Sequence, residues 1–360
     1  QLDNDAIVFG AEEYLREALA PYAAEPPLLL AIISSCAAGL IGDDIEAIAR
    51  GAGLSCPIAV LDSSGLSGSF ADGWDKAACA VLSAFLPEQR AGQANAVNLI
   101  GVTSAYYNGE NDAHELMRLL ALAGYHVNVA LGCDMSAADL SGLTQAALNI
   151  VVHDELGGGA ARLLAETCGM PCIAPLPPYG RAGTRKWLVE IGRALPAPRA
   201  DAAEEEITRV TREDFLRINE CKSLWGELRY ETALIRAPRS TAWGIAQALR
   251  TEWADVCHLA VAADAEGVPT AAPIADEILG ETDAVRIREL LNGLDGGLLI
   301  GSSNESAHIN PRTAAYFPAA YPVQDVLHLS DAPFMGLRGA RHIEETLWND
   351  RILRRKILLP

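Results

Sequence analysis

The residues whose types and spacing are best suited to chemistry lie between positions 34 and 46, around the first cysteine of the chain. This stretch reads SSCAAGLIGDDIE and follows an apolar run that predicts a buried strand over 28–33. Parallel α/β sheets bind ligands just beyond the carboxyl ends of their strands, which is where Cys36 stands. A thiolate is a good ligand for a soft metal, although one cysteine does not make a metal site. Gly39 has no side chain, so the backbone there can lie close to a ligand. Asp43 and Asp44 begin the next helix, where capping and negative charge are favourable.

The other cysteines do not predict a second site. The chain has eight cysteines, and their spacing contains neither a CxxC pair nor a zinc-binding pattern. We expect most of them to be buried, reduced thiols of a cytoplasmic protein.

A second polar stretch follows the apolar run 148–152 and reads His153-Asp154-Glu155. An imidazole is a competent metal ligand, so His153 is a candidate ligand; the alternative is a histidine that caps a turn. The glycines at 157–159 fit either an anion-binding nest or a tight turn. No GxGxxG, P-loop, GxSxG or HExxH motif occurs, so the sequence carries no signature of ordinary dehydrogenase or hydrolase chemistry.

Short apolar runs alternate with helical patterns along the whole chain. Apolar runs at 57–61, 96–101, 127–131, 148–152, 172–174, 232–235, 258–261 and 297–301 predict strands, and turns and helical patterns lie between them. Continuous apolar strands alternating with helices are typical of parallel sheets covered on both faces. We therefore predict an α/β fold of three doubly wound modules, at residues 1–94, 95–200 and 201–360, the last including an acidic connector and a polar helix.

Charge and hydropathy exclude two classes of partner. The chain has 28 Lys and Arg against 47 Asp and Glu, for a net charge of −19, which is unsuited to neutralising nucleic-acid phosphates or binding an anionic membrane surface. Its apolar runs are far shorter than the roughly 20 residues that span a bilayer. We expect neither nucleic acid nor membrane as a partner.

The segment from Cys36 to Ile45 closely resembles the cysteine segment of the nitrogenase component 1 superfamily. That superfamily includes the nitrogenase molybdenum–iron protein subunits, their cofactor-assembly scaffold, dark-operative protochlorophyllide reductase and nickel-sirohydrochlorin reductive cyclase. The resemblance implies that Cys36 ligates an iron–sulfur cluster between two related subunits, with Gly39 and Asp43 around it. It also implies an oligomer of homologous subunits and an ATP-dependent iron–sulfur reductase as electron donor.

The likeness extends along nearly the whole chain. Further stretches that resemble the family are 8–12, 67–75, 169–184, 301–305 and 333–349. The segments 67–69 and 73–75 are similar to those of β-type subunits. The family fold, three Rossmann-like domains, agrees with the three modules counted above.

The sequence departs from the family in two places. The family supplies two further cluster cysteines upstream, whereas this chain has none before Cys36 and opens at Gln1. Either an N-terminal segment is missing, which we expect, or a partner completes the cluster, or the cluster is absent. Cofactor-holding subunits also place a cysteine where this chain has His153-Asp154-Glu155, so the nitrogenase cofactor itself is not expected here.

The leading hypothesis is a subunit of a nitrogenase-like oxidoreductase, which relays electrons from the reductase through an interface cluster to a substrate. In this interpretation Asp43 and Asp44 cap the helix or lie behind the cluster ligand. The alternatives are a non-catalytic scaffold for metallocofactor assembly and a cluster-free structural relative. The substrate is not indicated.

Overall fold

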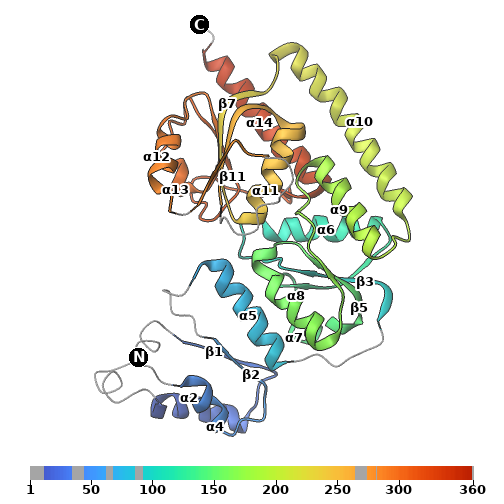
Figure 1. Cartoon of the computed structure of the whole chain (residues 1–360), viewed down its shortest axis with the longest axis vertical. Coiled ribbons are helices and arrows are strands. Elements are labelled where there is room, and N and C mark those ends of the chain that lie inside the picture. Colours follow the sequence, from blue (N-terminus) through green and yellow to red (C-terminus); the bar gives the residue numbers. More distant parts are fainter. Residues whose placement is uncertain are drawn as a thin grey trace.

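Three parallel β-sheets follow one another along the elongated molecule. The computed structural model describes residues 12–34, 44–61, 68–85, 92–263, 274–280 and 282–358. Within them lie sheets of two, four and five strands, and every strand pair is parallel. Figure 1 shows the first sheet at one end, the third at the other, and the second between them. The predicted α/β fold with parallel sheets is confirmed, while the boundaries 1–94, 95–200 and 201–360 stay predictions.

The first sheet pairs β1 (Leu30–Ile33) with β2 (Ile58–Leu61). Helices α2 (Glu12–Ala24), α4 (Ile45–Gly51) and α5 (Phe70–Ala84) pack around this pair. The Asp44 carboxylate accepts a hydrogen bond from the Ala47 amide at 2.9 Å and so caps α4, as predicted. The strand predicted at 28–33 forms over Leu30–Ile33, but the prediction that it is buried was wrong, because Leu28 and Ile33 are 54% and 66% exposed.

The second sheet has the order β4-β3-β5-β6 and is covered on both faces. Its strands are β3 (Gln93–Ile100), β4 (His126–Leu131), β5 (Ala146–Val151) and β6 (Cys172–Ile173). Side chains alternate across a strand, so Leu99 packs with α6 (Gly109–Leu122) while Ile100 packs with α8 (Asp154–Cys168). Two short helical segments, α7 (Ala137–Leu140) and η1 (Leu143–Gln145), lead into β5.

The third sheet has the order β11-β10-β7-β8-β9. Its strands are β7 (Arg229–Arg236), β8 (Asp255–Ala262), β9 (Glu277–Leu279), β10 (Leu298–Gly301) and β11 (Ala315–Pro318). On one face lie α11 (Arg239–Ala248) and a π-helical turn, η2 (Leu249–Trp253); on the other lies α12 (Ala284–Asn292). The short α13 (Ser303–Ser306) follows β10.

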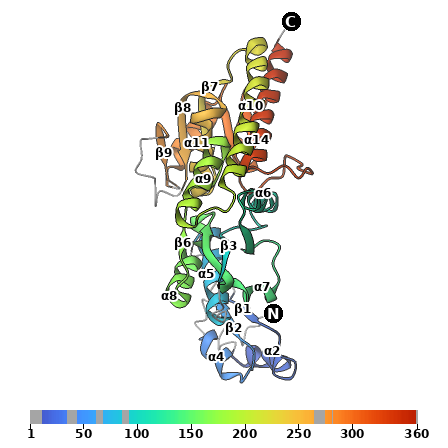
Figure 2. The same ribbon diagram turned by 90° about the vertical axis from the view of Figure 1, so that its right-hand side faces the viewer.

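Long helices join the second sheet to the third. The predicted polar helix forms as α10 (Ala200–Trp225), and the last helix, α14 (Gly336–Leu358), contacts α6, α9 (Gly180–Ala194) and α10. Figures 1 and 2 show α10 and α14 side by side along the same edge of the molecule. The C-terminal part of the chain therefore returns to pack against elements that precede it by more than a hundred residues.

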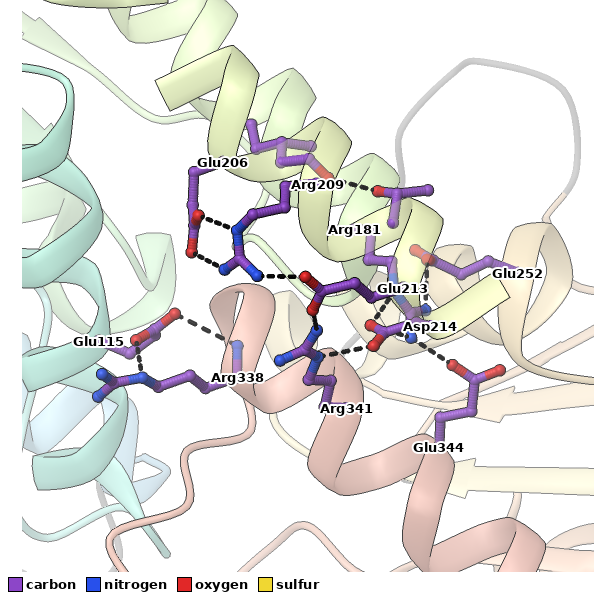
Figure 3. A network of polar contacts seen from close by, with 12 residues as sticks. Glu115, Arg181, Glu206, Arg209, Glu213, Asp214, Glu252, Arg338, Arg341 and Glu344 are labelled. Carbon is purple, nitrogen blue, oxygen red and sulfur yellow. Dashed lines mark hydrogen bonds and ion pairs between the residues drawn. The ribbon is translucent and has the colours of Figure 1, made fainter. Parts of the chain in front are cut away.

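A buried cluster of charged side chains fixes this junction. Arg181 on α9 is paired with Asp214 on α10 at 2.8 Å, Glu252 on η2 at 3.3 Å and Glu344 on α14 at 2.7 Å. Arg341 on α14 reaches the same Asp214 at 2.7 Å. Figure 3 shows the carboxyl groups of three elements converging on the guanidinium of Arg181. Arg341 also pairs with Glu213 at 3.0 Å, so two guanidinium groups meet four carboxyls. Burial raises the pKa of Glu344 to about 7.

Candidate functional site between the second and third sheets

The carboxyl ends of two sheets border one cavity. In the second sheet the strand order reverses between β3 and β5, and in the third it reverses between β7 and β10. Open α/β sheets bind ligands at such switch points. Segments that follow all four strands line a single cavity of about 750 Å³, a size common among small-molecule sites.

Aromatic and small apolar side chains form most of the cavity wall. The rings come from several elements: Phe70, Tyr106, Tyr107, Tyr179, Tyr321 and Phe334. Phe70 belongs to α5, so all three parts of the fold contribute to the wall. Four lining residues carry a carboxyl or guanidinium group: Asp112, Glu155, Arg236 and Glu305.

His153 lies buried in the wall and is tied to a serine and a glutamate. The Ser240 hydroxyl donates to Glu155 Oε1 at 2.8 Å, so its oxygen accepts from His153 Nδ1 at 2.7 Å. This network assigns the proton to Nδ1 and the lone pair to Nε2. Burial lowers the pKa of His153, which keeps the imidazole neutral at pH 7.

The structure bears on both interpretations of His153 that the sequence left open. His153 stands at the N-cap position of α8, yet its side chain makes no capping hydrogen bond. Its ring packs edge-on to Tyr106 with centroids 5.2 Å apart. In the part of the chain that the structure describes, no group of three or more His, Cys, Asp or Glu side chains could hold a metal ion. A ligand role for His153 stays a prediction.

Asp112 joins the two sides of the cavity. Its Oδ1 accepts hydrogen bonds from the backbone amides of Phe334 and Met335 at 2.6 and 2.7 Å. Asp112 does not cap its own helix, because α6 begins at Gly109 after Asn108 and Asp112 lies inside it. Burial raises the pKa of Asp112 to about 7 despite the two amide donors.

Tyr179 and Glu305 complete the polar part of the wall. The Tyr179 hydroxyl is buried, and burial, followed by the charges of Asp112 and Glu155, raises its pKa, so it stays protonated. Glu305 accepts from the backbone amide of Ser302 at 3.0 Å in a capping box and pairs with Arg236 at 3.1 Å.

The predicted cluster segment lies only partly within the described residues. Cys36, Gly39 and Asp43 lie outside them, whereas Asp44 is the helix cap described above. The seven described cysteines are all free, but just two of them, Cys56 and Cys133, are buried. The expectation of mostly buried thiols was therefore wrong for this set.

The glycine triplet lies within α8 rather than in a loop before it. The amides of Gly159 and Ala160 donate to the Asp75 carboxylate of α5 at 3.0 and 3.1 Å. A Cβ on Gly157 would lie 2.7 Å from the Gly101 nitrogen, so this glycine permits close packing of α8 on the end of β3. The two amides thus hold a carboxylate of the protein itself.

Sequence reasoning did not single out Tyr106, Asp112, Tyr179 or Arg236 as site residues. Three of them share one signal, since Tyr106, Tyr179 and Arg236 stand in or next to segments that follow predicted strands. The role of Asp112 has no such signal, because its partners lie 222 and 223 positions away.

Comparison with known proteins identifies the family. A sequence profile of the nitrogenase component 1 type oxidoreductases matches residues 1–350. The chain belongs to this family. Its Rossmann-like sheets and its likeness to nitrogenase in solved structures agree with that assignment.

Curated relatives are subunits of one enzyme, light-independent protochlorophyllide reductase. The relative from Methylobacterium sp. (strain 4-46) is 26% identical over 348 residues, which cover 94% of this chain and 67% of that protein. The corresponding protein from Prosthecochloris aestuarii (strain DSM 271 / SK 413) is 29% identical over 174 residues, which cover 46% of this chain and 31% of that protein. The chain thus spans about two thirds of the first relative and less than a third of the second.

Solved structures of nitrogenase Cp1 share the fold. The structure at pH 6.5 superposes with a TM-score of 0.77 at 15% identity, covering 100% of this chain and 83% of the other. The structure at pH 5 gives a TM-score of 0.71 at 19% identity, covering 100% and 78%. Among the described helices of this family member, none combines the length and apolar character that crossing a bilayer requires.

Proposed function

We propose that this chain is a subunit of a nitrogenase-like oxidoreductase that reduces a substrate held in the cavity between the second and third sheets. The observation that carries the proposal is the cavity itself, because the switch points of two sheets face it in a member of an oxidoreductase family. Electrons come from an ATP-dependent iron–sulfur reductase. The protein acts in the cytoplasm, in complex with a homologous subunit.

An iron–sulfur cluster at the subunit interface is part of this proposal, with Cys36 as one thiolate ligand and Gly39 and Asp43 beside it. The described residues alone do not provide a ligand set for such a cluster. We therefore derive no electron-transfer step through it. The free state of the seven described cysteines supports a reducing compartment.

The cavity residues bind and orient the substrate. Aromatic rings and small side chains give it an apolar wall that displaces water. Asp112 holds the Phe334–Met335 backbone against α6, which fixes one side of the cavity. The hydrogen bond between His153 Nδ1 and the Ser240 hydroxyl fixes the ring of His153, so that its unprotonated Nε2 points away from Ser240.

A scaffold for metallocofactor assembly is the second candidate. The neutral His153 favours it, since an imidazole with a free lone pair is a ready metal ligand. The two candidates differ in turnover. A catalytic subunit reduces its substrate repeatedly, whereas a scaffold loads and releases a cluster.

The first experiment measures iron and acid-labile sulfide in the full-length protein purified without oxygen. We expect both in the wild type, their loss in Cys36→Ala, and their retention in the control Cys172→Ala, which alters an exposed cysteine. A full-length wild type without iron overturns the electron relay. Repeated turnover with an ATP-dependent iron–sulfur reductase then separates the enzyme from the scaffold.

A further inference from the structure

The cavity wall carries more negative than positive charge. Among its described lining residues Arg236 bears the permanent positive charge, and it is committed to Glu305 at 3.1 Å. Within the described part of the chain, no ion pair joins Asp112 or Glu155 to a lysine or arginine. Arg239, next to Ser240, is paired with Asp154 outside the lining. His153 adds no compensating charge, because burial keeps it neutral.

Asp112 and Glu155 act on the same part of the cavity. Both line this cavity together with Tyr179. In agreement with that placement, both carboxyls raise the pKa of the Tyr179 hydroxyl, after the larger effect of burial. The two amide donors to Asp112 bind its Oδ1, and no hydrogen bond to Oδ2 occurs among the described residues. The cavity is thus lined by a buried carboxyl, one oxygen of which accepts no hydrogen bond from the described residues.

Aromatic rings line the same cavity as these carboxyls. Tyr107 lies 5.7 Å from Phe334, centroid to centroid, and Phe70 lies 6.0 Å from Tyr106. The faces of such rings attract cations. The Tyr107 hydroxyl is buried without a hydrogen-bond partner in the structure, so a ligand with an acceptor atom could satisfy it.

The sequence offers no cation from the segments adjoining the lining residues. Positions 62–67, 264–273 and 281, which lie outside the described residues, contain four acidic residues and neither Lys nor Arg.

We propose that this cavity binds a flat, ring-bearing organic cation, with Asp112 and Glu155 facing its positive charge and the aromatic rings contacting its ring system. The proposal rests on the proposed function in one respect, namely that the substrate occupies this cavity. It concerns binding alone and involves no electron transfer. Anionic ligands of the same shape are rejected, since they would meet two carboxyls without a free cation.

Three probes of nearly equal shape test the charge preference: cationic 9-aminoacridine, neutral acridine and anionic 9-anthracenecarboxylate. The affinity of each probe is measured by titration calorimetry at about pH 8. About 0.3 M NaCl in the buffer screens the acidic surface of the protein. We expect one site per chain for 9-aminoacridine, with an affinity at least about tenfold above that for acridine, and no binding of the anion. Absence of the cationic site, or equal or tighter binding of the anion, overturns the proposal.

Paired variants locate the site. Glu155→Gln is expected to weaken 9-aminoacridine binding by about tenfold and to leave acridine binding within about twofold. The control Glu220→Gln changes an exposed glutamate of α10 and leaves both affinities as in the wild type. Equal effects of the two variants would place the cation on the acidic surface and overturn the assignment.

The pH dependence of 9-aminoacridine binding to the wild type tests the role of Asp112 without a variant. The groups facing Asp112 are Glu115 on its own helix, which pairs with Arg118 and with Arg338 of α14, and Tyr179 before α9. Its pKa of about 7 means that its negative charge develops as the pH rises. The affinity for 9-aminoacridine should increase between about pH 6 and pH 8, and a flat or falling profile counts against the proposal. Iron content and turnover are measured separately, so either proposal can fail alone.

Discussion

The Nη2 atom of Arg181 lies 2.7 Å from Oε2 of Glu344, although the two residues are 163 positions apart in the chain. The contact joins the helix behind the cavity, α9, to the last helix, α14. Arg181 also neutralises Asp214 and Glu252, so one guanidinium serves three carboxyls of three elements. Stability therefore depends strongly on this one side chain.

Arg181→Ala is expected to destabilise the protein by about 3–5 kcal/mol, since it leaves buried carboxylates without their cation. The control is Arg185→Ala on the same helix, which removes an exposed pair with Glu204 and is expected to cost at most about 1 kcal/mol. Urea unfolding followed by circular dichroism measures both. Equal losses would show that the buried cluster contributes no more than a surface pair.

The pH dependence of stability should change in Glu344→Gln. The folded-state pKa of Glu344 is raised from 4.5 to about 7, so the folded protein binds the proton more tightly than the unfolded chain. Its contribution is fully present below about pH 4.5 and is lost as the pH rises through 7. Asp112, also raised to about 7, acts in the same direction.

The lowered pKa of His153 acts in the opposite direction, so the test is the difference between two proteins. We expect the urea midpoint of the wild type, relative to that of Glu344→Gln, to fall between about pH 5 and pH 8, because the variant lacks the contribution of Glu344. The control is Glu345→Gln, which changes an exposed neighbour of Glu344. Its urea midpoint should follow that of the wild type at every pH. Parallel profiles for wild type and Glu344→Gln would contradict the assignment.

Gly157→Ala tests the close approach of α8 to β3. The added Cβ would lie 2.7 Å from the Gly101 nitrogen and 2.8 Å from its Cα, so backbone must move, at a cost of about 1–3 kcal/mol. The matched control is Gly192→Ala in α9, where a Cβ meets nothing within 4 Å. There we expect a gain of about 0.5–1 kcal/mol, because alanine favours a helix interior. Thermal unfolding distinguishes a loss from a gain.

Asp75→Ala tests the link between α5 and α8. Loss of the carboxylate leaves the amides of Gly159 and Ala160 without this acceptor, and we expect a cost of about 1–3 kcal/mol. Amide hydrogen exchange should accelerate at Gly159 and Ala160. The control Glu166→Ala alters an exposed residue of α8 and should change neither measurement.

The sheets could be predicted from sequence because their central strands are buried on both faces. Residues such as Leu99, Ile150 and Ile300 are fully buried, and a strand covered on both faces appears as a continuous apolar run. β9 and β11 were not predicted, since strands of three and four residues at the edges of a sheet carry little pattern. The exposure of some β1 residues likewise could not be predicted, because an apolar run does not indicate which of its side chains remain exposed.

The polar contacts of the site could not be predicted from local pattern. Asp112 lies near the start of a helix, and an acidic residue there is ordinarily explained as a cap. Its actual partners come from a segment more than two hundred residues later. His153 shows the same limit, because its partner Ser240 is 87 positions away. Only the three-dimensional arrangement of the sheets brings these residues together.

Helix α14 is synthesised long after the residues that it contacts, and this has a consequence for folding during translation. During translation at roughly 5–20 residues per second, Arg181 leaves the ribosome about 8–33 s before Glu344, given their separation of 163 positions. Throughout that interval the nascent chain holds Arg181 without Glu344, and Asp112 without the amides of Phe334 and Met335. The strands of the second sheet all precede residue 174, so during that interval this sheet can form but its helix α6 lacks the contact with α14, and the nascent chain is open to chaperones.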